Sequence, residues 1–268
     1  MATDIKALRT RIKSVDSTLH LTKAMGLVAS SKIRRAAENM SRSRQYSEAV
    51  AETVRKLSSS PSCRRGPYLS SPGQGMHRII VIAGDRGMAG GYNSNVFRAA
   101  DSLAGETISF LPIGKRACDR YGKGFASSEK FSFSDAKTLA DSLCEEFLSG
   151  KTAEVEIIYT RYVSIMSQIP VKIKVLPLPV GESSASDMIF EPDEESVLKF
   201  AVPEYVAGLI YASVRESFAS EVTARRMAMD SAGKNAQQMI DSLSLQYNRA
   251  RQSAITQEIT EIVAGSGD

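Results

Sequence analysis

The chain of 268 residues has few of the residues from which metal centres and catalytic dyads are built. It has three cysteines, Cys63, Cys118 and Cys144, with no C-x-x-C pair, and two histidines, His20 and His77. The wide spacing argues against a cysteine/histidine metal site and against a Cys-His or Ser-His dyad. We therefore expect no metal ligands and no catalytic residues, and the unpaired cysteines suggest a reducing, cytoplasmic-type compartment.

Long apolar runs are also lacking. No run approaches the roughly 18 residues of a membrane span, and residues 1–5 do not resemble the apolar core of a signal peptide. We expect a chain that is neither secreted nor membrane-spanning by itself.

Proline is absent from residues 1–60 and from every position after Pro203. If most of the last 66 residues form one helix, it would run roughly 90 Å at about 1.5 Å per residue. A helix of that length needs a partner for its apolar stripe, because packing supplies most helical stability.

Residues 1–60 supply such a partner. Alternating steps of three and four positions from Ile5 pass through a run of mainly apolar or small residues, which predicts a coiled coil. These residues are the predicted seam of the N-terminal helix: Ile5, Leu8, Ile12, Val15, Leu19, Thr22, Gly26, Ala29, Ile33, Ala36, Met40, Ser43, Ser47, Val50, Val54 and Leu57.

Positive charge is concentrated in the same segment, which holds 12 lysines and arginines against 5 aspartates and glutamates. A charged face that keeps the helix soluble explains this excess most simply. An acidic protein partner is a second explanation, and a coiled-coil tether that binds nucleic acid is a third. The face away from the seam carries Arg9, Lys13, Lys23, Lys32, Arg34 and Arg35.

The middle of the chain has a different period. Short apolar runs alternate with helical patterns, which predicts a layered, mainly parallel sheet. We expect strands at 78–83, 107–112, 154–162 and 171–176, and helices at 92–103, 115–121 and 135–148.

The C-terminal part begins with a short helix at 193–200, and Pro203 then occupies the first turn of the long helix. That helix keeps the three-four rhythm at Met229, Ala232, Ala236, Met239 and Leu243, and a similar stripe returns at Ile255, Ile259 and Ile262. The fold class is therefore α/β: a long antiparallel coiled coil of the N- and C-terminal helices with an inserted Rossmann-like α/β domain. The expected divisions are a helix at 1–60, a linker at 61–75, the α/β domain at 76–192 and a helix at 193–268.

A glycine-rich turn, GDRGMAGG at residues 84–91, follows the first predicted strand and precedes a helix. Rossmann folds bind a pyrophosphate at this position through G-x-G-x-x-G, but Asp85 and Arg86 separate the first two glycines here. Because the position matches but the spacing does not, a structural or partner-contacting turn is the favoured interpretation. A nucleotide-dependent oxidoreductase is the alternative. No phosphate loop, G-x-S-x-G or H-E-x-x-H motif occurs.

Several runs resemble the gamma subunit of F-type ATP synthases. LTKAMGLVASSKIRR at 21–35 resembles its N-terminal signature, and DRGMAGGYN at 85–93 resembles its loop after the first strand. Two runs resemble its C-terminal signature, SEVTARRMAMDSAGKNA at 220–236 and YNRARQSAITQEITEIVAG at 247–265.

The resemblance implies a non-catalytic rotor subunit without cofactors. It implies partners in the alpha and beta subunits of the catalytic hexamer, the epsilon subunit and the c-ring, and no nucleic acid. The complex would be peripheral to the membrane, on the cytoplasmic face of a bacterial inner membrane or the matrix side of an organelle, and would couple proton flow to ATP synthesis.

The resemblance also implies partner-contacting residues. Those matched to beta-subunit contacts, including an acidic lever, lie on the two long helices, and those in the glycine-rich turn are matched to foot or stator contacts. The set is Lys23, Met25, Arg34, Arg35, Asp85, Arg86, Gly87, Arg251, Gln252, Thr256 and Glu258.

Overall fold

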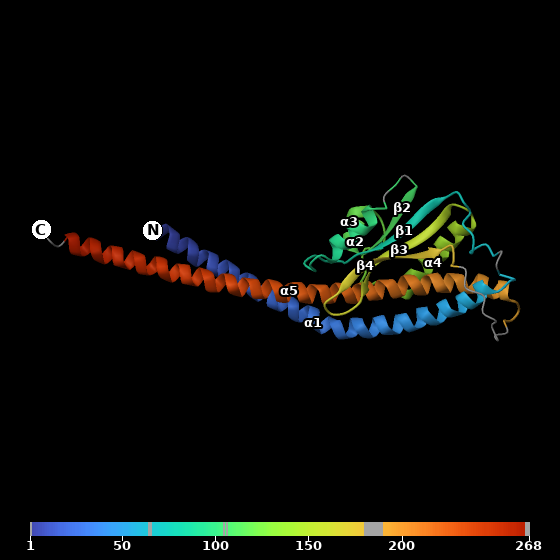
Figure 1. Cartoon of the computed structure of the whole chain (residues 1–268), viewed down its shortest axis with the longest axis horizontal. Coiled ribbons are helices and arrows are strands. Elements are labelled where there is room, and N and C mark those ends of the chain that lie inside the picture. The colour runs from blue at the N-terminus through green and yellow to red at the C-terminus, as the bar shows by residue number, and fades with distance from the viewer. Residues whose placement is uncertain (1, 64–65, 104, 106, 180–189, 266–268) are drawn as a thin grey trace. The chain divides into compact units, whose positions relative to one another are not determined.

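A computed structural model describes residues 2–63, 66–103, 105, 107–179 and 190–265 (Figure 1). Two compact units divide the chain, one made of residues 1–30 and 225–268 and the other of residues 31–224. The elements, in chain order, are α1 (Ala2–Ser59), β1 (Met76–Ile82), α2 (Tyr92–Asp101), β2 (Ile108–Ile113), α3 (Lys115–Tyr121), α4 (Phe133–Leu148), β3 (Thr152–Tyr162), β4 (Gln168–Leu176) and α5 (Glu194–Gly265).

In the first unit α1 and α5 pack side by side in opposite directions. A Cβ atom at Gly26 would lie 3.6 Å from Met229 Cβ, and one at Gly233 would lie 3.5 Å from Thr22 Oγ1. Further along, the guanidinium of Arg226 donates a hydrogen bond to the Ser30 hydroxyl. As the residue numbers of these contacts increase along α1, those of their partners on α5 decrease. The predicted antiparallel pair is therefore confirmed.

The seam predicted from Ile5 to Leu57, which we call the α1 seam, is also confirmed. Its members are buried or half-buried along the whole helix, and Leu19, Ala29 and Ala36 are each less than 5% exposed. The small residues let the two backbones approach, and the apolar ones remove surface from water at about 25 cal/mol per Å².

The seam predicted on α5 is wrong at one position. Met239 is 46% exposed, whereas Ile240 is half-buried, because the inward face advances four residues from Ala236 before it reaches Leu243. A helix with 3.6 residues per turn places its inward-facing residues three or four positions apart. This period does not determine which of the intervals contains four. The half-buried positions then continue through Tyr247, Ala250 and Ala254.

In the second unit a four-stranded sheet has the order β2-β1-β3-β4. β1 pairs in parallel with β2 and β3, and β4 pairs antiparallel with β3. The β3–β4 connection is a tight hairpin in which Val163 N donates to Ser167 O at 3.2 Å. So short a connection permits only antiparallel pairing. The expected mainly parallel sheet is confirmed, with one antiparallel edge strand.

Each face of the sheet is covered by helices. On one face Ile79, Val81 and Ile158 pack against Val96 and Ala100 of α2. On the other face a larger core joins the sheet to α4 and to the parts of α1 and α5 in this unit; its largest fully buried side chains include Leu57, Ile80, Ile82, Ile113, Leu143, Phe147, Ile157, Leu176 and Ile210.

The segment 61–75, expected to be a linker, is anchored on this core at two described positions, whereas its residues 70–75 are exposed. Cys63 and Tyr68 are buried, and the Tyr68 ring stacks on Phe147 with centroids 6.2 Å apart. The Leu178 amide donates to the Tyr68 carbonyl at 2.8 Å. The serines, prolines and glycines shape the path of the segment, while two apolar side chains anchor it.

The expected separate helix at 193–200 is wrong, because α5 is continuous from Glu194 and contains Pro203. A proline inside a helix costs about 3 kcal/mol. Leu198, Val202 and Val206, on both sides of the proline, are buried in the core, and this packing holds the helix together.

By length and composition, α5 is also the one helix among the described residues that could cross a membrane. Of its most apolar stretch 44% is buried within the protein, so its apolar composition is accounted for by the core of the second unit.

Asp85, just after β1, ties together the loops at this edge of the sheet. Its carboxylate accepts hydrogen bonds from the Ser128 amide at 2.8 Å, the Ser127 hydroxyl at 2.7 Å, and the amides of Lys115 and Glu129 at 3.2 and 3.3 Å. Burial acts to raise the pKa of this carboxyl, but the hydrogen bonds outweigh it and hold the pKa below its usual value.

The same loop is held by both long helices. From α5, the Arg215 guanidinium donates to the carbonyls of Ser128 at 2.7 Å and Phe131 at 2.9 Å. From α1, Lys32 Nζ lies 2.6 Å from a Glu129 carboxylate oxygen. Residues 127–131 therefore join β1, α1 and α5 through one hydrogen-bonded network.

We expect Asp85→Asn to lower the stability of the second unit by about 1–3 kcal/mol at pH 7, because buried donors lose a charged acceptor. The lowered pKa gives the sign of the pH dependence. The stabilisation is complete above the unfolded-state pKa of about 3.9 and is lost as pH falls through the lower folded-state pKa. The difference in Tm from wild type should therefore shrink at acid pH.

The matched control is Asp119→Asn, whose carboxylate is 52% exposed and lies 3.8 Å from Arg116. Equal Tm values for the two variants at pH 7 would contradict the assigned role of Asp85.

Candidate functional site

The predicted partner-contacting residues lie on separate surfaces. Lys23 and Met25 are on α1 in the first unit, and Arg34 and Arg35 are on α1 in the second. Residues 85–87 form the turn after β1, and the remaining four lie near the end of α5: Arg251, Gln252, Thr256 and Glu258. The structure does not gather them into one pocket.

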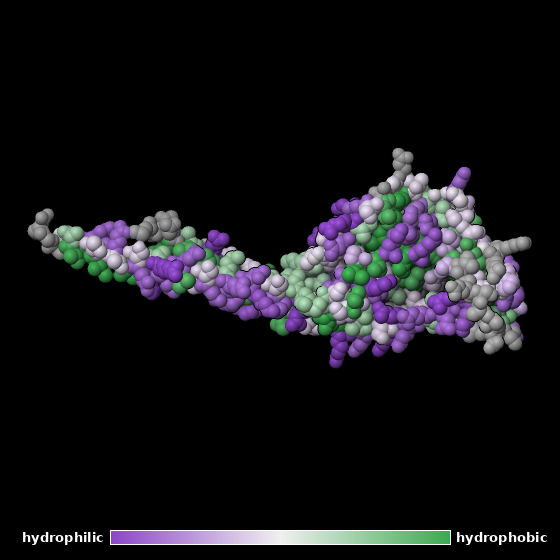
Figure 2. All heavy atoms as spheres, viewed as in Figure 1, coloured by the Kyte–Doolittle hydropathy of each residue, from purple (hydrophilic) through white to green (hydrophobic). Residues whose placement is uncertain are grey.

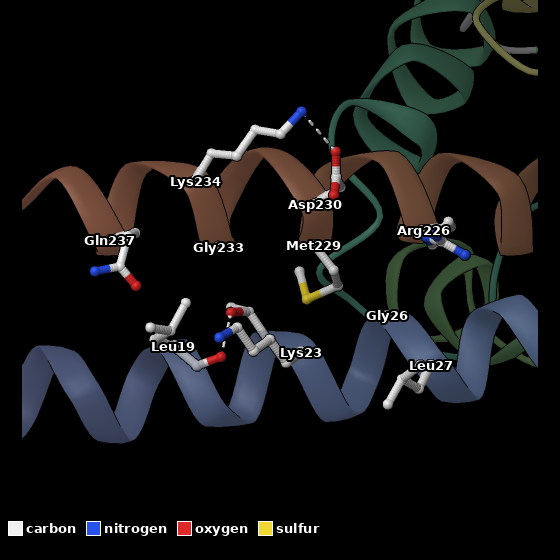
Figure 3. Close-up of a pocket in the computed structure, with 11 residues that line it drawn as sticks. Leu19, Lys23, Gly26, Leu27, Arg226, Met229, Asp230, Gly233, Lys234 and Gln237 are labelled. Atoms are coloured by element: carbon white, nitrogen blue, oxygen red, sulfur yellow. Dashed lines mark hydrogen bonds and ion pairs between the residues drawn. The ribbon is translucent and has the colours of Figure 1, made fainter.

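Lys23 lines an open groove of about 530 Å³ between α1 and α5 of the first unit (Figure 3). Gly26 and Gly233 leave room because neither has a side chain, and Met229 points from α5 toward Gly26. The other residues that line the groove are Leu19, Thr22, Leu27, Arg226, Asp230, Lys234 and Gln237.

The charge of this groove is mainly positive. Asp230 is the one carboxylate among the lining residues, and Lys234 Nζ lies 3.1 Å from it. Lys23 and Arg226 then give the groove an excess of positive charge over an apolar floor. A partner that presents acidic side chains beside an apolar one would match this surface.

In the second unit Arg34 and Arg35 give α1 a positively charged surface. The Arg34 side chain is 92% exposed, and its nearest carboxylate, Glu38, is 3.9 Å away. Arg35 is exposed beside a second hollow, which Lys32 and Glu129 also line. Both guanidinium groups are accessible to a partner.

The volume of this second hollow is about 360 Å³, and residues of α1, α5 and the 127–131 loop line it. Lys32 and Glu129 pair across it, and Arg215 donates to the loop carbonyls at its base. Its polar groups are thus largely engaged within the unit, which leaves Arg35 as its accessible charge.

The turn at 84–91 is filled by the chain itself. A Cβ atom at Gly84 would lie 2.7 Å from the carboxylate of Glu221, which is 2% exposed. The Gly84 amide already donates a hydrogen bond to the Asn93 side chain at 2.9 Å. The Asp85 carboxylate accepts a hydrogen bond from the Lys115 amide at the start of α3. The two carboxylates would repel a pyrophosphate, and the Gly84 amide is not free to bind one. The geometry therefore argues against dinucleotide binding.

Of the three residues predicted in this turn, Asp85 is engaged inside the unit, as described above. Arg86 is exposed and Gly87 is half-buried. Of these three residues, Arg86 therefore has the most accessible side chain, and Met88 in the same turn is also 61% exposed.

The end of α5 presents polar and apolar side chains on a largely exposed helix. Arg251, Gln252, Thr256 and Glu258 are exposed, and the Thr256 hydroxyl donates to the Gln252 carbonyl at 2.9 Å. Figure 2 shows apolar surface at this end of the helix. Four large apolar side chains among and beyond these residues are 47–70% exposed: Ile255, Ile259, Ile262 and Val263. Such residues on a helix end indicate a surface that another protein covers.

Sequence reasoning missed two groups of residues. Gly233, Asp230 and Lys234 of the groove lie on α5 opposite the α1 seam, and the small residue at 233 facing Thr22 was the available signal. The second group is His77 with Glu154 and Glu156, whose ligand atoms all lie within 4.8 Å of one another. Alternation along β3 puts the two glutamates on one face, but only strand pairing brings His77 beside them.

The groove yields a test of helix spacing. We expect Gly26→Ala to leave stability unchanged or raise it by up to about 1 kcal/mol, because alanine favours a helix and its Cβ would be in ordinary contact with Met229. Gly26→Ile adds atoms beyond that contact and should lower stability by about 1–3 kcal/mol. Thermal unfolding of the two variants measures the difference, and equal Tm values would show that α1 and α5 do not meet closely here.

Comparisons with known proteins agree over nearly the whole chain. The family model described as ATP synthase matches residues 4–267. An ATP synthase gamma chain of Ruminococcus albus is 39% identical, over 98% of this chain and 98% of the relative. An "ATP synthase gamma chain, sodium ion specific" of Acetobacterium woodii is 37% identical, over 99% of each chain.

Solved structures share the fold. A chain of the Euglena gracilis mitochondrial ATP synthase, in a structure of OSCP/F1/c-ring, has a TM-score of 0.70 at 17% identity, covering 99% of this chain and 94% of that one. A chain of the Tetrahymena thermophila mitochondrial ATP synthase, in a structure of the central stalk and c-ring, has a TM-score of 0.63 at 22% identity, covering 79% of this chain and 99% of that one. With two long terminal helices, an inserted α/β unit and relatives matched from end to end, the chain belongs to the family of ATP synthase gamma chains.

Proposed function

We propose that the chain is a non-catalytic rotor subunit, which transmits torque between a membrane c-ring and a catalytic hexamer of alpha and beta subunits. The observation that carries this proposal is the end-to-end match with gamma chains at 36–39% identity. Catalysis is assigned to the beta subunits, and this chain supplies mechanical coupling without a cofactor of its own.

Transmission of torque requires helices that do not slip past one another. In the first unit the facing positions Gly26 and Met229, and Thr22 and Gly233, interlock α1 with α5. In the second unit Lys32 and Arg215 fasten the same two helices to the 127–131 loop. Buried contacts and charge-assisted hydrogen bonds of this kind resist sliding, because sliding would leave buried polar groups unpaired.

We assign the beta-subunit contacts to the exposed residues of the two helices. In the first unit Lys23, with half-buried Met25 two residues further along α1, fits an acidic lever. In the second unit Arg34 and Arg35 present positive charge to the same kind of partner. The mixed surface of Arg251, Gln252, Thr256 and Glu258 fits a bearing that surrounds the end of α5, because it offers hydrogen bonds and apolar contacts together.

We assign contacts with the epsilon subunit and the c-ring to the α/β unit, with Arg86 as an exposed residue of its glycine-rich turn. The complex is peripheral to the membrane, on the cytoplasmic face of a bacterial inner membrane or the matrix side of an organelle. The partners are proteins, and nucleic acid is not among them.

We propose the proton as the coupling ion. A relative of 37% identity is named as sodium ion specific, so the ion calls for a direct measurement. ATP hydrolysis by the complex in sealed vesicles should acidify the lumen without added sodium. Acidification that requires sodium would overturn this assignment.

Co-purification tests the subunit assignment. The chain is expressed with its own alpha and beta subunits, and the product is compared with a preparation that lacks it. We expect one copy of the chain in the ATP-hydrolysing complex. A fully active complex that excludes the chain would overturn the proposed function.

We expect Arg251→Ala combined with Gln252→Ala to reduce coupled ATP synthesis several-fold, because the end of α5 loses its hydrogen bonds to the surrounding subunits. Helix content and Tm should stay unchanged, since both side chains are exposed. The matched control is Glu145→Ala with Lys151→Ala, two exposed charged residues of the α/β unit. Wild-type synthesis by the first variant would show that these side chains only fill space.

A further inference from the structure

A cluster of three ligand-type side chains lies on one face of the sheet and includes none of the partner-contacting residues named above. His77 Nε2 lies 3.0 Å from Glu156 Oε2 and 4.0 Å from Glu154 Oε2. Oxygens and a nitrogen bound to one ion at about 2.0–2.2 Å are separated by distances of this order. The cluster is partly shielded from water, because the Glu156 side chain is 6% exposed and that of His77 is 22% exposed.

The strands hold these residues rigidly. His77 on β1 is directly opposite Glu154 on β3, and Glu156 is the next residue of β3 on the same face. The β1–β3 register shifts between Met76 and His77, and the β3–β4 register shifts between Val155 and Glu156. Such irregularities re-aim side chains, and here they flank the cluster on both of its strand pairs.

Two lysines of β4 orient the carboxylates. Lys172 Nζ lies 2.8 Å from Glu156 Oε1, and Lys174 Nζ lies 2.8 Å from Glu154 Oε1. Each glutamate thus uses Oε1 for a lysine and leaves Oε2 on the side of His77. Residues that hold the second oxygen of a ligating carboxylate in this way are typical of the surroundings of metal sites.

The inward-facing atoms are not satisfied by one another. His77 Nε2 and Glu156 Oε2 are both buried, and neither makes a hydrogen bond to a described residue, so with a neutral imidazole their 3.0 Å contact leaves both atoms unpaired. Leaving buried polar atoms unpaired costs about 1–3 kcal/mol each, which an ion between them would remove.

We propose that His77, Glu154 and Glu156 form a binding site for a divalent transition-metal ion of the zinc type. The imidazole nitrogen and two carboxylate oxygens provide three ligands, and solvent at the exposed side of His77 provides the fourth. The ion ties β1 to β3 and therefore stabilises the sheet. The two ammonium groups offset the carboxylate charge, which weakens binding and keeps the site reversible.

The test uses the full chain and Zn²⁺ as the probe. Calorimetric titration should show one ion bound per chain, and Tm should rise with Zn²⁺ concentration. His77→Gln and Glu156→Gln should each weaken binding about tenfold or more and remove the rise in Tm. The matched control is His20→Gln, since exposed His20 also lies near a carboxylate, 3.7 Å from Asp16; this variant should bind as wild type does.

Cobalt(II) distinguishes this site from binding at a cysteine. Its spectrum should show no thiolate charge-transfer band and should be unchanged in Cys118→Ser, the variant of the half-buried cysteine. In purified ATP synthase complex, bound zinc should fall by one ion per copy of the chain on His77→Gln. Zn²⁺ binding that survives His77→Gln and Glu156→Gln, or no binding by the folded wild-type chain, would overturn the proposal; neither result bears on the rotor assignment.

Discussion

The close approach of two uninterrupted helices is the constraint on which the structure depends. α1 and α5 can bury their apolar stripes against each other only where small residues let the backbones meet, as at Gly26 opposite Met229 and Gly233 opposite Thr22. The same small residues leave the groove beside them, so the geometry that stabilises the helix pair also shapes a surface for a partner. Larger residues at these positions would separate the helices and remove both features.

Two carboxylates near the glycine-rich turn have different structural roles. Asp85 accepts amide and hydroxyl hydrogen bonds and organises the loop that α1 and α5 grip through Lys32 and Arg215. Glu221 of α5 packs closely against Gly84, which lies in a turn whose sequence resembles a phosphate-binding loop. A glycine-rich turn is therefore needed here for close packing, and the motif alone would assign it the wrong chemistry.

The sequence predicted the features that depend on local period. The α1 seam, the helix at 115–121 and the strands all follow from spacing and apolar content. It failed where tertiary packing outweighs local preference: core contacts carry α5 through Pro203, and Cys63 and Tyr68 anchor a segment that composition alone marks as a linker. Of the candidate site residues, the exposed ones on the helices were predictable from the family resemblance. The internal role of Asp85 and the neighbours of His77 were not, because loop closure and strand register decide them.

One helix, α5, has its early turns inside a hydrophobic core and its last turns almost bare. Val206 and Ile210 are fully buried, whereas Ile259 and Ile262 are more than half exposed. The backbone amides of a single helix should therefore exchange with solvent over a very wide range of rates, slowest near Ile210 and fastest toward Val263. Protection of the last turns then has to come from outside the chain, so their exchange rate reports assembly directly, residue by residue, without any label.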